Sequence, residues 1–310
     1  MSPWKDKDRV LALIIGVILI SAIILGAMAF IPLESFSRER DWNYSSTVPL
    51  ESLDIAIEAD VCDVHVTFSD LEDKWVEVSL NIEGRSGYIS GVPDINFTVD
   101  QSLNGADLSV HIGLDMDTGP TVTYDESDLL LTIDRSVLSF LNIEVDVGDV
   151  VITVPENATL DGAMVHADVG GLHVNLEEGA IVGDLELRSD VGSVNLDSSN
   201  AIFADGTVVS AATGTGSVHM DVEQTSAPMG NITFECSADV GSVNLVLLIA
   251  GDVSAEVTSQ ANVGDINTDL VGFSGMDVHL LSDNHPDVWK IELYLEADVG
   301  SVYIDAEWGE

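Results

Sequence analysis

The sequence predicts an all-β protein, a single-stranded β-solenoid with an antiparallel N-terminal portion, preceded by one transmembrane helix. The solenoid is predicted by a short phrase that occurs eight times and by the alternation of apolar and polar residues within it; the helix is predicted by a long uncharged run. Six copies follow one another every 22 to 25 residues, a period typical of stacked laps. The copies are ADVCDVHV (59–66), VDVGDVVI (145–152), ADVGGLHV (167–174), SDVGSVNL (189–196), TGTGSVHM (213–220), ADVGSVNL (238–245), ANVGDINT (261–268) and ADVGSVYI (297–304).

Each copy predicts a strand, a corner and a second strand. Apolar residues stand one place before the glycine and again two and four places after it. The first two of these positions are three residues apart, so a straight strand cannot bury both on one face. We therefore expect the chain to turn at the glycine and to bury the apolar residues on either side of it. Glycine and the Ser, Asp or Gly that follows it suit such a tight corner, although Cys62 replaces the glycine in the first copy.

The glycine spacing predicts that each interval between glycines forms one lap of the solenoid, with two or three short faces. Strand residues advance about 3.3 Å each and neighbouring strands lie about 4.8 Å apart, so equivalent Val, Leu and Ile residues would form columns in a narrow core. A β-sandwich, whose turns usually recur every 8 to 12 residues, is the alternative. The longer interval between Gly264 and Gly300 predicts an insertion, which we place around Ser282 to Pro286.

The chain before the regular laps is expected to be less uniform. Residues 51–141 contain the first copy and four alternating apolar runs, and Asn104-Gly105 between two of these runs is a hairpin signal. We expect antiparallel strands here, with residues 32–50 as a linker before them and the regular laps over 142–310.

The run Val10 to Ile31 is uncharged and long enough to span a bilayer as a helix. Lys5, Lys7 and Arg9 precede it, which favours a cytoplasmic tail over residues 1–9 and places the rest of the chain outside the cytoplasm. A cleaved signal peptide is the alternative, because Ala27-Met28-Ala29 resembles a cleavage site. We expect a single-pass protein of the cell membrane.

The composition is strongly acidic, with a formal net charge of −44 at pH 7. Nucleic-acid binding requires a positive face and is excluded on this ground. Anionic lipid or polysaccharide would need a bridging cation. The simplest interpretation is a solvated surface suited to a salty exterior.

An aspartate stands two places before most of the glycines, and its parity points outward. Carboxylates stacked on neighbouring laps repel one another, so either the side chains bond the corner backbone or they hold a cation. Oxygen ligands on adjacent laps are the kind that Ca²⁺ prefers. We therefore expect these side chains either to bond the corner backbone, which is the simpler role, or to hold calcium at Asp146, Asp168 and Asp190, and we expect no other cofactor.

A second outward column, three places after the glycine, includes His173, Asn195 and His219. These two histidines would lie two laps apart, too far to share a zinc ion, so we expect a polar ladder in which Asn amides bond along the column. Cys62 and Cys236 would be several laps apart and are predicted to be free thiols.

The recurring phrase resembles a family of prokaryotic repeat domains described as putative adhesins. The resemblance covers roughly Ser52 to Trp308 and is clearest where ITVP (152–155) and NATL (157–160) lead into ADVGGLHV. It implies a surface protein of β-strand repeats and provides no catalytic residue to transfer to this chain.

The sequence contains neither a Gly-x-Ser-x-Gly elbow, nor a phosphate-binding glycine loop, nor a His-Glu-x-x-His motif. We therefore expect a non-enzymatic, structural or adhesive role at the cell envelope, with an envelope polymer or a surface protein as partner. One alternative is an envelope sensor that regulates another membrane protein. Another is a carbohydrate-active β-helix enzyme, which only the presence of Arg188 close to Asp190 supports.

Overall fold

The computed structural model describes residues 33–46, 49–87, 92–116, 122–286 and 289–309, and every regular element in these ranges is a β-strand. The predicted cytoplasmic tail (1–9) and transmembrane helix (10–31) lie outside the described residues. Within the described ranges, the structure contains no helix that is long and apolar enough to cross a membrane. The all-β prediction is confirmed.

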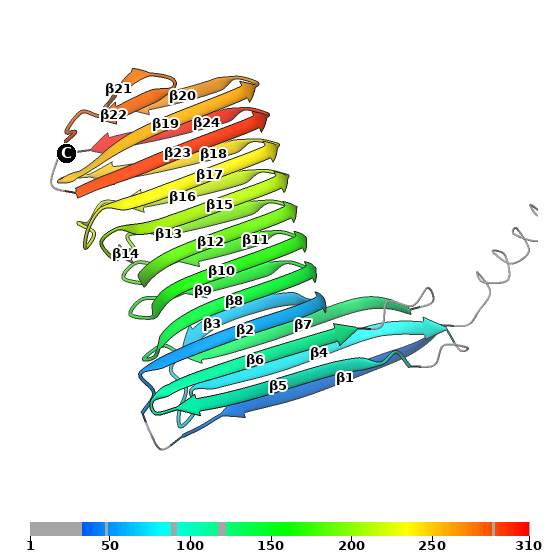
Figure 1. Cartoon of the computed structure of the whole chain (residues 1–310). Helices are drawn as coiled ribbons and strands as arrows, with labels where there is room; N and C mark the ends of the chain where they lie inside the picture. Colours follow the sequence, from blue (N-terminus) through cyan, green and yellow to red (C-terminus); the bar gives the residue numbers. More distant parts are fainter. Residues whose placement is uncertain (1–32, 47–48, 88–91, 117–121, 287–288, 310) are drawn as a thin grey trace, which may run out of the picture.

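The strands form two large mixed sheets, which enclose a single apolar core (Figure 1). In spatial order, sheet A contains β1 (Leu33–Tyr44), β4 (Val76–Gly87), β7 (Val122–Asp134), β3 (Asp63–Ser69), β9 (Val150–Val154), β11 (Leu172–Leu176), β13 (Val194–Ser199), β16 (Val218–Gln224), β18 (Val243–Ala250), β24 (Val302–Gly309) and β20 (Ile266–Val271). Sheet B contains β21 (Phe273–Met276), β22 (His279–Ser282), β19 (Val253–Val263), β23 (Trp289–Val299), β17 (Ile232–Val240), β15 (Thr207–Thr215), β12 (Ile181–Val191), β10 (Thr159–Val169), β8 (Leu138–Val147), β2 (Ser52–Val61), β6 (Asp107–Met116) and β5 (Ile95–Asn104), with the short β14 (Ile202–Phe203) beside β12.

Each recurring phrase runs from a strand of sheet B through the glycine corner into a strand of sheet A. Successive phrases pair in parallel and in register: Val169 of β10 lies opposite Val191 of β12, and Leu172 of β11 lies opposite Val194 of β13. From β6 to β19 in sheet B, and from β7 to β20 in sheet A, all neighbouring strands are parallel. Equivalent positions of the phrase therefore stack in columns, as the sequence predicted.

The spatial order of the laps departs from the chain order at the C-terminal end. The last lap, β23–β24, lies between the β17–β18 lap and the β19–β20 lap. The longer interval between Gly264 and Gly300 accommodates this reversal. It contains the antiparallel hairpin β21–β22 in addition to the loop around Ser282 that we predicted as the insertion. Thr268 of β20 is a polar residue in an inward position. It is tolerated there because β20 is the last strand of sheet A and is only partly buried.

The N-terminal region differs from the prediction in two places. The expected linker over residues 32–50 is wrong for Leu33–Tyr44, since these residues form β1, which pairs antiparallel with β4 at the edge of sheet A. The antiparallel pairs β5–β6 and β4–β7 are confirmed, as is the hairpin turn, where Gly105 has φ +71°. However, β6 and β7 also pair in parallel with β2 and β3, so they add one more rung to the stack.

The core is built from alternate residues of every lap. Except on β20, residues two and four places after the glycine are buried as predicted, for example Val194 and Leu196, each 0% exposed. The burial predicted for the residue before the glycine is wrong: Val169, Val191 and Val299 are each about half exposed. The reason is geometric, since the strand of sheet B continues past the core before the chain turns. These valines therefore form an outer ridge along the corners.

The two cysteines are free, as predicted, and both are buried. Cys62 lies at the first corner and Cys236 in β17, and burial raises the pKa of each thiol to about 12. Both thiols are therefore protonated at neutral pH and unreactive.

Candidate functional site

The glycine corners stack along one edge of the molecule, and the candidate site lies beside this edge. Gly170 and Gly192 have φ of +157° and +156°, a backbone conformation that side chains rarely adopt. A Cβ placed on Gly192 would lie 1.8 Å from the carbonyl oxygen of Gly170 on the lap below. Each corner therefore rests directly on the previous corner, and its N–H bonds across the lap boundary, as from Gly170 N to Val191 O at 3.0 Å.

The residue after the glycine provides a second set of bonds between corners. The Asp63 carboxylate accepts the Asp149 N–H at 2.8 Å, and the Asp149 carboxylate accepts the Gly171 N–H at 2.6 Å. Ser193 and Ser217 take the same position on later laps, with longer contacts of 3.4 Å to the following amides. This explains why Asp or Ser follows the glycine so often.

The predicted aspartate column exists on the outer face of sheet B, beside the corners. Asp146, Asp168 and Asp190 lie on the adjacent strands β8, β10 and β12. The alternative role expected for them, bonding of the corner backbone, belongs instead to Asp63 and Asp149. Of the column, Asp60 alone accepts a backbone hydrogen bond in the described ranges, from Met116 N–H at 2.9 Å. Calcium at Asp146, Asp168 and Asp190 stays a prediction.

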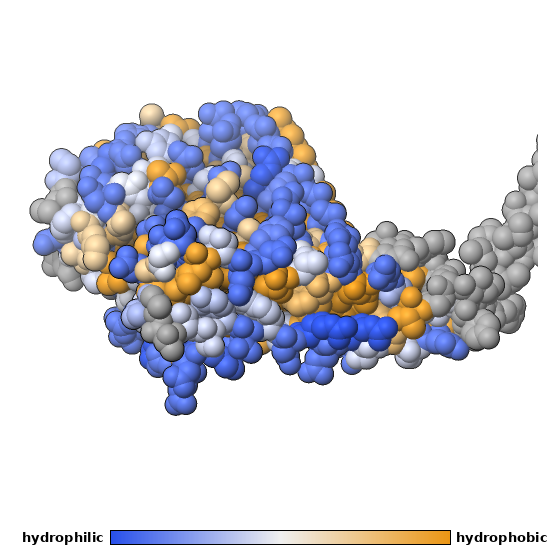
Figure 2. All heavy atoms as spheres, turned by 60° about the horizontal axis from the view of Figure 1, so that its bottom comes forward, coloured by the Kyte–Doolittle hydropathy of each residue, from blue (hydrophilic) through white to orange (hydrophobic). Residues whose placement is uncertain are grey.

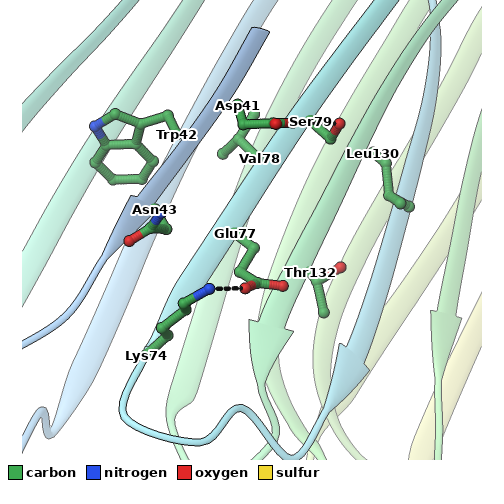
Figure 3. Close-up of a pocket in the computed structure, with 9 residues that line it drawn as sticks. All are labelled: Asp41, Trp42, Asn43, Lys74, Glu77, Val78, Ser79, Leu130 and Thr132. Carbon is green, nitrogen blue, oxygen red and sulfur yellow. Dashed lines mark hydrogen bonds and ion pairs between the residues drawn. The ribbon is translucent and has the colours of Figure 1, made fainter.

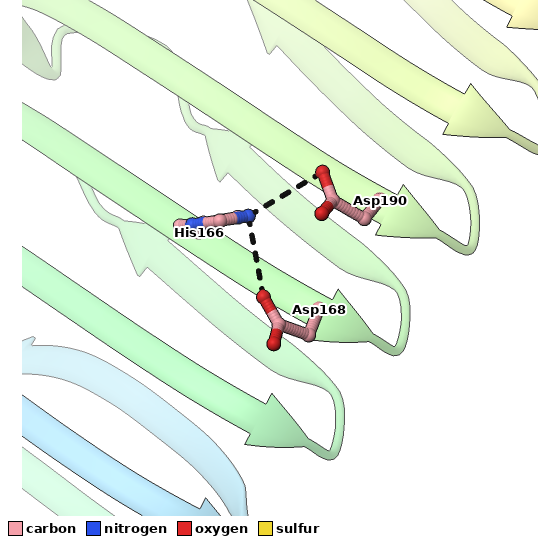
Figure 4. A group of neighbouring side chains, drawn as sticks. All are labelled: His166, Asp168 and Asp190. Carbon is pink, nitrogen blue, oxygen red and sulfur yellow. Dashed lines mark ion pairs between the residues drawn. The ribbon is translucent and has the colours of Figure 1, made fainter.

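The structure adds a histidine to two of these aspartates (Figure 4). His166 precedes Asp168 by two residues in β10, so both side chains point to the same side of the sheet. His166 Nε2 lies 3.6 Å from Asp168 Oδ1 and 3.6 Å from Asp190 Oδ1 on the next strand. Each of the three residues has a ligand atom within 4.8 Å of a ligand atom of the other two, and Asp146 is not part of the group.

Sequence reasoning missed His166 because it examined each column by itself. The available signal was a His-x-Asp pair on one lap followed by an aspartate on the next. In parallel in-register pairing, that spacing brings the imidazole beside both carboxylates.

Arg188 neutralises part of this group. Its Nε and Nη2 donate to Asp190 Oδ1 at 3.2 and 3.1 Å. These hydrogen bonds and the nearby positive charge hold the pKa of the Asp190 carboxyl below its usual range. The guanidinium side chain itself is 60% exposed and is free to leave.

The second outward column is stacked as predicted. His173 lies opposite Asn195, which lies opposite His219, so the two histidines are two strands apart on sheet A. The expected amide bonds along this column are absent among the described side chains. His173 instead lies 3.6 Å from Asp197, which makes it a histidine with a single carboxylate neighbour.

At the C-terminal end, a second charged group holds the hairpin β21–β22 against the stack. Glu256 of β19 accepts a bond from Lys290 Nζ at 2.5 Å and lies 2.9 Å from His279 Nε2 of β22. The hydrogen bonds from Lys290 and His279 lower the pKa of the Glu256 carboxyl to about 2. This group is an ion-pair network that joins three strands.

The base of the molecule is the end of the stack at which β1 and β5 are the outermost strands, and apolar side chains are only partly buried there. Figure 2 shows apolar side chains gathered between polar ones on this face. Trp42 and Tyr44 of β1 and Phe97 and Val99 of β5 pack partly buried against the core. A shallow hollow on the outer face of sheet A lies nearby, between β1 and β7, where Lys74 pairs with Glu77 at 2.5 Å (Figure 3). The side chains that line the hollow are of mixed chemistry and do not converge on one point.

Comparisons with known proteins find solved structures of low similarity to this chain. A putative cell adhesion protein from Clostridium sporogenes is similar in structure, with a TM-score of 0.40 and 11% identity, over 88% of this chain and 100% of that one. A putative adhesin from Bacteroides fragilis has a TM-score of 0.35 and 13% identity over 87% and 97% of the two chains. A putative adhesin from Parabacteroides distasonis has a TM-score of 0.34 and 9% identity over 88% and 97%. No family model and no curated protein matches the chain.

Proposed function

We propose that this protein is a membrane-anchored, extracytoplasmic β-solenoid with a structural and adhesive role at the cell envelope, and that it is not an enzyme. The observation that supports this role best is the in-register parallel stack. It repeats the same outward positions at intervals of about 4.8 Å. A surface of this kind presents equivalent groups in rows, which suits a repetitive partner such as an envelope polymer.

The outer face of sheet A near the C-terminal end is the part we assign to contact. His219, Asn244, Asn267 and Tyr303 line a shallow hollow there. Because the chain is strongly acidic, the partner would carry neutral or basic groups, or bind through a cation. Hydrogen bonding by amides and stacking on the exposed Tyr303 would provide the contacts.

A co-sedimentation experiment tests adhesion. The full chain is mixed with isolated envelope polymer and compared with a His219→Glu/Asn244→Glu/Tyr303→Glu variant. We expect polymer binding by the full chain and at least a tenfold loss in the variant. A matched control places three glutamates on the outer face of β5 (Asn96→Glu/Thr98→Glu/Ser102→Glu) and should bind as the unmodified chain does.

Other results would replace the proposal. Equal binding by all three proteins, or none by any, contradicts adhesion through this face. Release of polymer fragments that stops in Asp190→Ala would indicate a carbohydrate-active enzyme. Co-purification of one integral membrane protein, lost when residues 10–31 are exchanged for another apolar segment, would indicate a sensor.

The anchor is tested separately. If residues 10–31 span the membrane, the intact chain stays in the membrane fraction after a carbonate wash, and protease added from outside digests residues 33–309. Recovery of a shortened chain in the medium would indicate a cleaved signal peptide instead.

A further inference from the structure

The group formed by His166, Asp168 and Asp190 has an unsatisfied polar atom at its centre. His166 Nε2 is buried and has no hydrogen-bond partner in the described part of the chain. Its distances of 3.6 Å to the two carboxylate oxygens are too long for hydrogen bonds, which need about 2.7–3.2 Å. A buried nitrogen placed between two carboxylates without bonding to either is costly unless something else binds it.

We propose that these three residues form a binding site for a divalent transition-metal ion of the zinc class on the outer face of sheet B. The distances agree with this assignment. Ligand atoms in tetrahedral zinc sites lie roughly 3.3–3.5 Å apart, with bonds of about 2.0–2.2 Å. One ligand atom of each residue lies within 4.8 Å of those of the other two, so a single ion can contact all three residues. Rotation of these partly exposed side chains brings the atoms to bonding distance, with water as the remaining ligand.

The ligand types select the ion. An imidazole nitrogen is a good ligand for Zn²⁺ and a poor one for Ca²⁺, which takes six to eight oxygens. Two carboxylates and a neutral imidazole also balance the charge of a divalent ion. Two of the three residues predicted to bind calcium, Asp168 and Asp190, are therefore assigned to a different class of metal ion.

Arg188 acts as a competitor for the ion. Its guanidinium occupies the same oxygen of Asp190 that would bind the metal, and it can swing into solvent. Removing it should strengthen metal binding, whereas a purely structural role of Arg188 would leave metal affinity unchanged. The His166→Ala variant distinguishes the site from general attraction of cations to an acidic surface, because that attraction does not require an imidazole ligand.

The test is a titration of the full chain with ZnCl₂ and, separately, with CaCl₂, followed by calorimetry and thermal melting at fixed ionic strength. We expect one saturable zinc equivalent that raises the melting temperature. His166→Ala should weaken binding about 100-fold, because it removes one of three protein ligands. Arg188→Gln should tighten it about tenfold by removing the competing charge. The matched control is His173→Ala, which removes a histidine with a single carboxylate neighbour and should leave zinc affinity unchanged.

Three results would overturn the proposal: no saturable zinc binding, equal zinc binding by His166→Ala and the unmodified chain, or displacement of zinc by an equal concentration of Ca²⁺. All these variants change partly exposed side chains, and circular dichroism establishes that they fold. The titration involves no cells or polymer, so its outcome is independent of the adhesive function proposed above.

Discussion

The middle of the stack and its two ends are built from similar strands but depend on different interactions. In the middle, from β8–β9 to β17–β18, every lap has a lap on each side, and each glycine corner rests on the one below. At the ends, antiparallel strands and hairpins replace the missing neighbour. Repetition of the sequence is therefore required only where one lap must fit onto another identical one.

Cys62 illustrates this rule. It occupies the place of the glycine in the first copy, and its carbonyl is the surface on which Gly148 rests, 2.0 Å from where a Cβ of Gly148 would lie. Cys62 itself is not at positive φ, and its side chain is buried with Sγ 3.3 Å from Asp63 O. The first corner tolerates a side chain because it begins the column.

The largest effect is expected for a glycine inside the column. Gly192→Ala would place a Cβ 1.8 Å from the Gly170 carbonyl oxygen, so the backbone must move. We expect a loss of more than about 4 kcal/mol in the free energy of unfolding. Gly206→Ala is the control: φ is +79°, but nothing lies within 4 Å of the new atom, so the cost should be only about 1–2 kcal/mol. Urea denaturation measures both, and similar losses would show that stacking of the corners is not the cause.

The second prediction compares the loss of stability on truncation of a core residue in the middle of the stack with that of one at its base. Phe234 is fully buried and makes an edge-to-face contact with Phe203, with ring centroids 5.8 Å apart. Phe234→Ala should cost about 3 kcal/mol or slightly more, as for other buried phenylalanines. Phe97 at the base is only partly buried, so Phe97→Ala should cost about 1 kcal/mol. An equal cost at both positions in thermal or urea unfolding would indicate that the base is packed as tightly as the middle.

The sequence predicted the middle of the stack better than its ends, because only in the middle must each lap fit onto another identical lap. Regular spacing identified the corner glycines, the inward positions after them and the outward aspartates, because identical laps impose identical environments. It could not predict that the last lap would lie between two earlier ones, since β20 and β24 carry the same phrase. Nor could it predict β1, whose charged sequence Arg38-Glu39-Arg40 lacks the usual apolar alternation. His166 was missed because its role arises from two laps together.

A smaller effect is expected for the side chains that join corners. Asp149→Ala removes the acceptor of the Gly171 N–H and should cost about 1 kcal/mol, a modest value because the bond is exposed. Asp146 lies on the same lap and makes no hydrogen bond or ion pair in the described ranges, so Asp146→Ala should change stability by less than about 0.5 kcal/mol. If Asp146→Ala were the more destabilising of the two, the aspartate column would have a structural role that its contacts do not explain.

The smallest effect concerns the C-terminal end, where charge helps to replace stacking. Hydrogen bonds from Lys290 and His279 lower the pKa of Glu256 to about 2, from an ordinary value near 4.5. A carboxyl with a lowered folded-state pKa stabilises the protein fully above its unfolded pKa, and this contribution is lost as the pH falls from about 4.5 to 2. The carboxyl is near the surface, so solvent screening limits the contribution to less than about 1 kcal/mol. The difference in unfolding free energy between the unmodified chain and Glu256→Gln should therefore be present at pH 6 and disappear towards pH 2. Hydrogen exchange of β22 followed at both pH values locates the effect, and a pH-independent difference would mean that packing, rather than the ion pairs, holds this hairpin to the stack.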